Sequence, residues 1–486
     1  MYLNEKLVIA KNKDKELYLV PKMCNRHGLI TGASGTGKTV TLKVMAETFS
    51  SAGIPVFLSD VKGDLSGMIE VGEMNDNISK RTSKLGLSDF QFTKFPCCFF
   101  DVFQKDGIPI RTTISEMGPV LLSKILSLTK AQEGALNIVF RIADDKNLEL
   151  VDLKDLRAML NYIGEHSKEY TMTYGNVSTQ SIGAILRSLL VLEEQGADLF
   201  FGDPFFDIKD FMKYDADTGR GIVNILNAST LVQNPKLYAT VLLWLLTELY
   251  EKLPEVGDLD KPKLIFFFDE AHLLFNDLEK DLEERVIQIV KLIRSKGVGI
   301  FFISQSPKDI PNEVLSQLSS RVQHSLRAYT PLEQKALKTI ADSFRENPNF
   351  KTIDIISELK TGEALVSFLD EEGMPNIVER VDILPPQSKI GPSSSSLIQS
   401  VITTSSFYDK YGKSLDTETA YEKIEQKMEE KKNDQKEIEK AKKVTKTLKN
   451  NSSIEKGIKK FANSTLSSMG REIGKSIIRG LFGTKK

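Results

Sequence analysis

The residues with the clearest chemistry form one short run near the N-terminus. The run Gly32-Ala33-Ser34-Gly35-Thr36-Gly37-Lys38-Thr39 fits G-x-x-x-x-G-K-[ST] at every fixed position. Its glycines let backbone N–H groups turn inward and hold phosphate oxygens, because no Cβ is in the way. Lys38 can reach the β- and γ-phosphates, and the Thr39 hydroxyl can ligate Mg²⁺. The run through Val40 therefore predicts a nucleotide-binding loop; the alternative is a glycine-rich turn without a ligand.

A second candidate group is a pair of carboxylates far along the chain. Asp269 and Glu270 follow the apolar run Leu264–Phe268. The C-terminal end of a strand in a parallel sheet faces the ligand crevice. Asp269 is then placed to hold Mg²⁺, directly or through water, and Glu270 to orient and deprotonate an attacking water. The alternative is a strand end carrying two solvated acids.

Two polar side chains are candidates for completing hydrolysis. Gln305 follows the buried run Val298–Ser304, where its amide can bond the γ-phosphate or the lytic water; it can equally be a turn residue before Pro307. Hydrolysis is often completed by an arginine from a neighbouring subunit. Arg294 is the first candidate for that role. The alternatives are Arg321, Arg327 and Arg380, and any of the four can instead be a salt-bridge residue.

Strands and helices must alternate to bring these residues together. Short apolar runs predict strands, and the runs between them have helical periodicity. The predicted strands are Gly28–Thr31, Pro55–Ser59, Gly221–Leu226, Leu264–Phe268 and Val298–Ser304. The predicted helices are Thr39–Ser50, Val177–Gln195, Lys236–Leu253 and Leu282–Lys296. This alternation predicts an α/β fold with a mainly parallel, doubly wound sheet, interrupted by a helical insertion at about residues 112–212.

Composition sets the broad class of the protein. The chain has 486 residues, of which 41% are hydrophobic and 27% charged, as in a soluble globular protein. No apolar stretch approaches the length of a membrane span, and the N-terminus lacks the pattern of a signal peptide. Three cysteines, Cys24, Cys97 and Cys98, are too few for a disulfide framework. These features predict a cytoplasmic protein.

The C-terminal hundred residues differ from the rest in charge. Residues 387–486 carry 21 basic and 12 acidic residues, a net of +9, against a net of −10 for residues 1–386. Residues 1–386 are the predicted core. Pro, Gly and Ser residues in 387–416 indicate a linker, and residues 417–486 are a predicted charged helical tail. Within that tail, Ile454–Phe482 has the pattern of a basic amphipathic helix.

Several motifs taken together resemble one superfamily. The phosphate loop, Asp60-Val61-Lys62-Gly63-Asp64, Phe268-Asp269-Glu270-Ala271-His272 and Ser304-Gln305-Ser306-Pro307 stand in the order seen in the HerA/FtsK superfamily of P-loop motor ATPases. More narrowly, the chain is similar to bacterial HerA-like proteins of the YjgR type. The stretches that carry this closer match are Gln132–Gly134, Asn137–Arg141, Tyr174–Ser178 and Gly362–Ser367.

The resemblance implies a RecA-like P-loop core that uses ATP and Mg²⁺, often as a hexameric ring. It implies that Lys38 and Thr39 are the Walker A pair, Asp269 and Glu270 the Walker B pair, and Gln305 the sensor. A trans arginine near Arg294 fits ring assembly. HerA itself has an N-terminal β-barrel before its phosphate loop, and fewer than 35 residues precede Gly32 here. DNA translocation is therefore a less direct expectation than ATP hydrolysis.

Two functions are compatible with these features. The first is a homo-oligomeric motor ATPase that couples Mg-ATP hydrolysis to DNA translocation or remodelling. The second is an ATP-dependent switch or scaffold that acts on protein or membrane partners through the basic helix at residues 454–482. In the second case the chain would lie on a membrane surface without crossing it.

Overall fold

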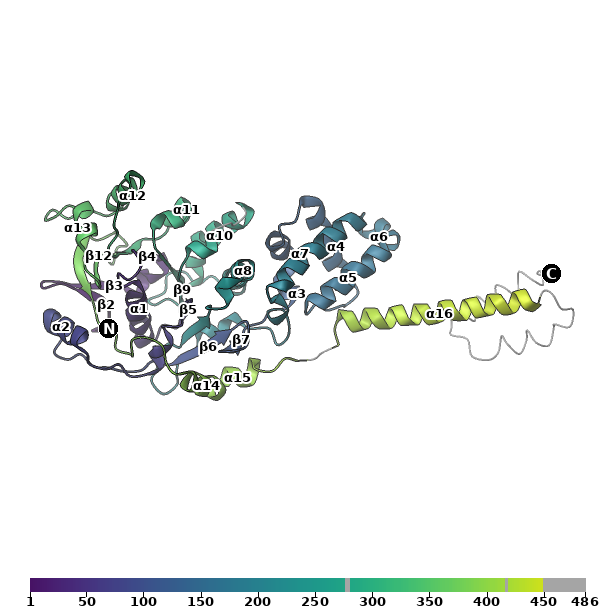
Figure 1. Ribbon diagram of the computed structural model, residues 1–486, viewed down its shortest axis with the longest axis horizontal. Coiled ribbons are helices and arrows are strands. Elements are labelled where there is room, and N and C mark those ends of the chain that lie inside the picture. The colour runs from purple at the N-terminus through teal and green to yellow at the C-terminus, as the bar shows by residue number, and fades with distance from the viewer. Residues whose placement is uncertain (276–279, 416–417, 449–486) are drawn as a thin grey trace.

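A computed structural model describes residues 1–275, 280–415 and 418–448. Among these residues, 13 strands form one sheet, and helices pack around it (Figure 1). The amphipathic helix expected at Ile454–Phe482 lies outside the described residues.

Parallel strands form the larger part of the sheet. In spatial order they are β11 (Ser320–Gln323), β4 (Gly28–Thr31), β10 (Val298–Ser304), β9 (Leu264–Phe268), β5 (Val56–Asp60), β8 (Val223–Asn227), β6 (Cys97–Asp101) and β7 (Ile108–Pro109). Every residue of β4, β5, β9 and β10 is buried. Strands covered on both faces need continuous apolar sequence, which explains why these runs could be recognised. The predicted α/β fold with a mainly parallel sheet is confirmed.

An antiparallel extension continues the sheet beyond β11. Its strands are β12 (Glu363–Ser367), β13 (Glu379–Ile383), β2 (Lys6–Lys11), β1 (Tyr2–Leu3) and β3 (Glu16–Leu19). The N-terminal segment therefore pairs with strands from the end of the core. This places the segment of residues 360–363, which leads into β12, close to the phosphate loop.

Helices follow the strands that they connect. The core helices are α1 (Lys38–Ser51), α2 (Asp76–Leu85), α8 (Pro235–Lys252), α9 (His272–Phe275), α10 (Lys280–Leu292), α11 (Asn312–Leu315), α12 (Pro331–Ala341) and α13 (Thr352–Glu358). The first of them, α1, packs against β4 and β5. This is the connection that carries the chain from the phosphate loop into the next parallel strand.

Five helices fill the region where a helical insertion is expected. They are α3 (Ile114–Ile125), α4 (Lys130–Asp145), α5 (Leu153–Glu165), α6 (Ser167–Tyr174) and α7 (Thr179–Glu194). They form a group beside the β6–β7 edge of the sheet (Figure 1). Helix α3 packs against α8 and α10 and so connects this group to the core.

The segment expected to be a linker lies against the core instead. It contains α14 (Ser395–Thr404) and α15 (Ser406–Tyr411). We call residues 387–393 the strap, because its backbone is hydrogen-bonded to Glu47, Glu70 and Gly72 of the core. Polar core groups supply these partners, which the composition of the strap alone does not reveal.

The last described element, α16 (Ala420–Leu448), extends away from the body (Figure 1). Its first turns pack against α5, where Ala420 and Ile424 are buried. Within the described ranges, no helix combines the length and the apolar character that a bilayer crossing requires.

Candidate nucleotide-hydrolysing site

The phosphate loop and the acid pair converge at one edge of the sheet. Strand β10 lies between β4 and β9, with Ser304 beside Thr31 and Phe302 beside Phe268. The chain leaves β4 toward β5 but leaves β10 toward β11, so the topological switch point lies between β4 and β10. Ligands of open α/β sheets bind at such points, outside the carboxyl ends of the strands. One strand separates β4 from β9, which spaces them by roughly 10 Å.

Glycines give the phosphate loop its shape. Gly32, Gly35 and Gly37 have φ angles of 153°, 76° and 114°. A Cβ on Gly32 would lie 2.5 Å from the Cβ of His324, so this position has no room for a side chain. A Cβ on Gly35 would have no atom within 4 Å, so space does not exclude a side chain there. Glycine is favoured at this position because its φ is positive. The loop then enters α1, whose N-terminal N–H groups are suited to hold an anion.

Lys38 lies inside this loop. Its ammonium donates to the carbonyl oxygens of Gly32, at 2.7 Å, and Ala33, at 3.1 Å. Burial lowers the pKa of Lys38 below its usual value, and the negative charges of Glu270 and Asp269 oppose that shift. Lys38 is therefore close enough to both acids to interact electrostatically with them. The structure thus brings Lys38, Asp269 and Glu270 near one another, and their roles toward a nucleotide stay a prediction.

A buried histidine lies against the phosphate loop and α1. His324 is completely buried, and its Nε2 lies 2.8 Å from the Thr41 hydroxyl of α1. Its Nδ1 lies 3.0 Å from the carbonyl oxygen of Glu363. Burial lowers the pKa of His324 to about 4, so the ring is neutral at physiological pH. Sequence reasoning missed this role, because nothing near His324 in the chain marks it.

The turn that precedes β12 contacts the same loop. The N–H of Gly362 donates to the carbonyl oxygen of Thr36 at 3.0 Å. Arg81 of α2 donates to the carbonyl oxygen of Gly362 at 2.9 Å. The antiparallel extension and α2 therefore hold the phosphate loop from the side opposite β10.

The acid pair is buried at the end of β9. Asp269 is 6% exposed and Glu270 is 8% exposed. Burial, followed by the charge of Glu270, raises the pKa of Asp269 to about 7. Glu270 has a φ of 48°, which is uncommon for a residue with a side chain. Such strain at a candidate catalytic position is typical of functional sites.

Lys62 contacts the acid pair from the loop after β5. Its ammonium lies 3.1 Å from Oε1 of Glu270. Asp60 shapes this loop by accepting the N–H groups of Lys62, Gly63 and Leu65. Burial raises the pKa of Asp60 to about 6. The sequence indicated that this motif lies at a strand end, but not that Lys62 bonds Glu270.

The donor set fits Mg²⁺ in the presence of a nucleotide. Oε2 of Glu270 is buried without a hydrogen-bond partner among the described residues and lies 3.5 Å from Nδ1 of His272. Thr39, the second residue of α1, is partly exposed. Mg²⁺ prefers one or two protein oxygens together with phosphates and water over a complete protein cage. In the part of the chain that the structure describes, no three His, Cys, Asp or Glu side chains cluster as a metal cage. Thr39 and Asp269 are the side chains suited to such an ion.

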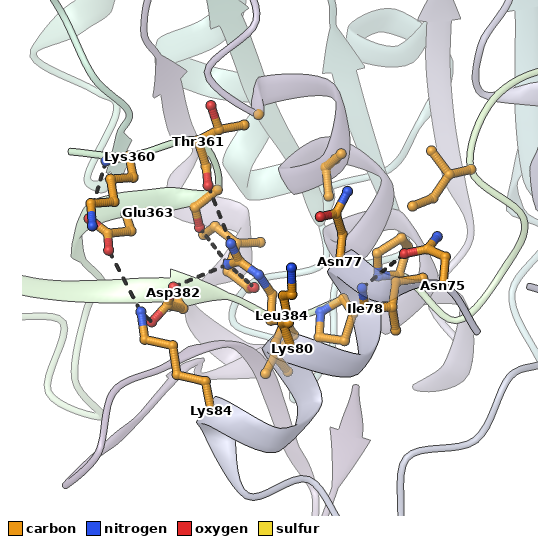
Figure 2. Close-up of a pocket in the computed structure, with 18 residues that line it drawn as sticks. Asn75, Asn77, Ile78, Lys80, Lys84, Lys360, Thr361, Glu363, Asp382 and Leu384 are labelled. Carbon is orange, nitrogen blue, oxygen red and sulfur yellow. Dashed lines mark hydrogen bonds and ion pairs between the residues drawn. The ribbon is translucent and has the colours of Figure 1, made fainter. Parts of the chain in front are cut away.

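A pocket of about 790 Å³ continues from the phosphate loop at Gly37 and Val40. In Figure 2, Asn75 and Asn77 of the α2 region lie on one side, and Lys360, Thr361 and Glu363 lie on the other. Its remaining lining includes the apolar residues Ile78, Ile383, Leu384, Pro385, Pro386 and Ile390. The pocket also has six charged side chains, Lys80, Arg81, Lys84, Lys360, Glu363 and Asp382. Apolar walls beside amide and basic groups suit a nucleoside attached to a loop-bound phosphate.

The two remaining candidate residues lie at opposite ends of strand β10. Gln305 is exposed directly after β10, at the edge of the phosphate loop and acid pair. Arg294 precedes the first residue of β10, one strand length of roughly 20 Å from that edge. It forms a 3.4 Å ion pair with Asp258. Arg294 cannot reach the nucleotide site of its own chain, and its role toward a neighbouring subunit stays a prediction.

These features define the chain as a P-loop NTPase of the RecA-like class, with a strand inserted between the phosphate loop strand and the acidic strand. A family model described as "Helicase HerA-like C-terminal" matches residues 5–486. The chain belongs to this family of HerA-like proteins.

Individual relatives are distant. The DNA double-strand break repair helicase HerA of Sulfurisphaera tokodaii is 22% identical over 368 residues, which are 73% of this chain and 64% of the relative. HerA of Sulfolobus acidocaldarius is 22% identical over 369 residues, covering 74% and 65%. The chain thus spans less than two thirds of the length of these relatives. The solved structure of VirB4 from Thermoanaerobacter pseudethanolicus has 16% identity and a TM-score of 0.49, over 80% of this chain and 98% of that one.

Proposed function

We propose that the protein hydrolyses Mg-ATP and couples the reaction to translocation or remodelling of DNA. The observation that carries the ATPase part is the convergence of Lys38, Asp269 and Glu270 at the switch point between β4 and β10. The DNA part rests on membership of the HerA-like family and on relatives that are named as DNA repair helicases.

Each side chain has a role in this proposal. Backbone N–H groups of the loop and the Lys38 ammonium bind the phosphates. Thr39 and Asp269 would hold Mg²⁺, which would neutralise phosphate charge. Glu270 accepts a proton from the water that attacks the γ-phosphorus, the bond to the β–γ bridging oxygen breaks, and ADP leaves. Lys62 holds the Glu270 carboxylate in position. Gln305 orients the water or the γ-phosphate.

The proposal includes a homo-oligomeric ring in the cytoplasm, in which Arg294 of one subunit completes the site of the next. Its placement away from the nucleotide site of its own chain supports this arrangement. An arginine supplied in this way stabilises the charge of the transition state and raises turnover by roughly 10³- to 10⁵-fold in NTPases that use one.

The test is phosphate release from Mg-ATP with no polymer, single-stranded DNA, duplex DNA or RNA. We expect DNA to accelerate turnover by wild type and by Lys13→Ala, a control at an exposed lysine. Lys38→Ala should reduce turnover with every polymer by roughly 10³-fold, because it loses a charge on the transferring phosphoryl group. Turnover that no nucleic acid stimulates would contradict the DNA part. Equal turnover by Lys38→Ala would contradict the ATPase part.

A further inference from the structure

A second pocket, of about 630 Å³, lies where the helical insertion meets the core. Residues of α3, α8 and α10 line it, and none of them belongs to the nucleotide site. Helix α3 opens this space, because Gly118 breaks the helix with a φ of 71° and Pro119 follows it. No atom lies within 4 Å of a Cβ at Gly118, so the left-handed backbone is what calls for glycine here.

The pocket contains more acidic than basic side chains. Its acids are Glu116, Glu248, Glu251, Asp281 and Glu284, and its bases are Lys124 and Arg285. Glu116 is paired with Lys252 at 2.5 Å, and Glu251 with Arg285 at 2.8 Å. Lys124 donates to a backbone oxygen of Asp281 at 3.5 Å. Glu248, Asp281 and Glu284 therefore have no ion-pair partner in the part of the chain that the structure describes.

Glu248 is the unusual member of this group. It is 7% exposed, lines the pocket, and has neither a hydrogen bond nor an ion pair among the described residues. Burial raises its pKa to about 7. Two further polar groups of α8 are buried without a hydrogen-bond partner in the described part of the chain. They are Nε1 of Trp244, one turn before Glu248, and the hydroxyl of Thr247, next to Glu248. Polar groups in such a position are costly without a partner, and the Glu248 carboxylate and the Thr247 hydroxyl can both accept hydrogen bonds, so they point to a ligand that donates them.

The lining favours an organic ligand over a metal ion. Among the described residues, no three acid, histidine or cysteine side chains come close enough to hold a metal. The apolar side chains Met117, Pro119, Leu121 and Trp244 form part of the wall, where they can cover methylene groups. An aromatic ring beside carboxylates is also a favourable environment for an ammonium group.

We propose that this pocket binds a small organic amine, whose ammonium group pairs with Glu248 and whose methylene chain lies along α3 and Trp244. Bound there, the amine links α3 of the insertion to α8 and to α10. This site does not depend on ATP hydrolysis, and its test needs no nucleotide.

Trp244 provides a direct probe, because it is the single tryptophan of the chain. Spermidine and putrescine are titrated into the full chain while tryptophan fluorescence and calorimetric heat are recorded. We expect saturable binding that weakens about 10- to 100-fold in Glu248→Gln, because the amide cannot neutralise the ammonium. Glu313→Gln, at an exposed acid of α11, should bind like wild type. Circular dichroism of both variants verifies folding.

The pH dependence gives a second readout. The groups around Glu248 are Glu251 and Lys252 of α8, Glu116 of α3, Glu284 and Arg285 of α10, and Asp207. The amine requires the ionised form of Glu248, so binding releases a proton and affinity should rise from pH 6 to pH 8. The rise approaches about tenfold per pH unit below pH 7, and Glu248→Gln should show none of it.

Several results would overturn the proposal. They are the absence of both heat and a fluorescence change, equal amine affinity in Glu248→Gln, or an equal response to MgCl₂ at the same ionic strength. None of these results bears on Lys38 or on ATP turnover, so failure of this site is distinguishable from failure of the proposed function.

Discussion

At the scale of single residues, Glu270 is the side chain whose position is hardest to explain by folding stability alone. It is buried, adopts a left-handed backbone and contacts Lys62 through Oε1. Its Oε2 lies 3.5 Å from Nδ1 of His272 and has no hydrogen bond among the described residues. Folding stability alone does not favour such a residue, because burying a carboxylate and straining its backbone both cost free energy. The arrangement is consistent with the proposed role of Glu270 as the group that accepts a proton from water.

Glu270→Gln tests this role. The amide retains the shape of the carboxylate but is a poor base, so we expect turnover to fall about 10²- to 10⁴-fold while the affinity for ATP changes little. Phosphate release and equilibrium binding of a fluorescent ATP analogue measure the two quantities. Glu313→Gln is the matched control at an exposed acid. A loss of affinity as large as the loss of turnover would instead indicate a structural role.

The phosphate loop and the acid pair could be predicted because each is a contiguous motif next to an apolar strand. Lys62 and His324 could not be placed by the same reasoning. Lys62 and Glu270 are in contact although 208 positions separate them in the sequence, and 283 positions separate His324 from its partner Thr41. Contacts at such separations depend on strand order, which a single sequence does not specify.

At the scale of elements, the strap is fixed to α1 by a buried carboxylate. Glu47 accepts the N–H groups of Gln387 and Ser388, at 2.7 and 3.1 Å, and the Ser388 hydroxyl at 2.5 Å. Lys43, one turn earlier on α1, donates to the carbonyl oxygen of Lys389. Pro385, Pro386 and Ile390 on either side of this contact line the pocket beside the phosphate loop. The strap thus holds one wall of the candidate nucleoside pocket.

Ser388→Ala should weaken this attachment. Loss of a hydrogen bond to a buried carboxylate lowers the free energy of unfolding by about 1 to 3 kcal/mol, and the wall it holds becomes less ordered. Urea unfolding and the KM for ATP measure the two effects. Ser400→Ala, on the exposed surface of α14, is the matched control. Unchanged stability in Ser388→Ala would show that the strap is held by its other contacts.

The elements that could be predicted and those that could not differ in physical character. The sequence predicts strands β4, β5, β8, β9 and β10 to within two residues, since burial on both faces makes them mostly apolar. The short antiparallel strands at the sheet edge carry charged residues and gave no such signal. Residues 387–416 are rich in Pro, Gly and Ser, a composition that predicts a linker, and the partners of the strap lie elsewhere in the chain.

At the scale of the whole molecule, the site and Arg294 lie at opposite edges of one sheet. This polarity is what a head-to-tail ring requires, because each subunit would present an arginine to the site of its neighbour. It also predicts that two defective subunits can complement one another.

Mixing Arg294→Ala with Lys38→Ala tests that complementation. The first variant has an intact phosphate loop but lacks the arginine, and the second has the arginine but a defective loop. Each alone should be nearly inactive, while an equal mixture should regain about a quarter of wild-type turnover, since a quarter of neighbouring pairs restore a complete site. Particle mass is measured in parallel. Full activity of Arg294→Ala alone would exclude this arginine from the reaction.

The most direct test of the account is the effect of Mg²⁺ on ATP affinity, measured in wild type, Lys38→Ala and Asp269→Asn. If the phosphate loop and the acid pair form one site, Mg²⁺ should tighten binding to wild type, and Asp269→Asn should lose at least about tenfold of that gain. Lys38→Ala should bind more weakly with and without Mg²⁺. An Mg²⁺ effect in Asp269→Asn as large as in wild type would contradict the claim that these residues act on the same nucleotide.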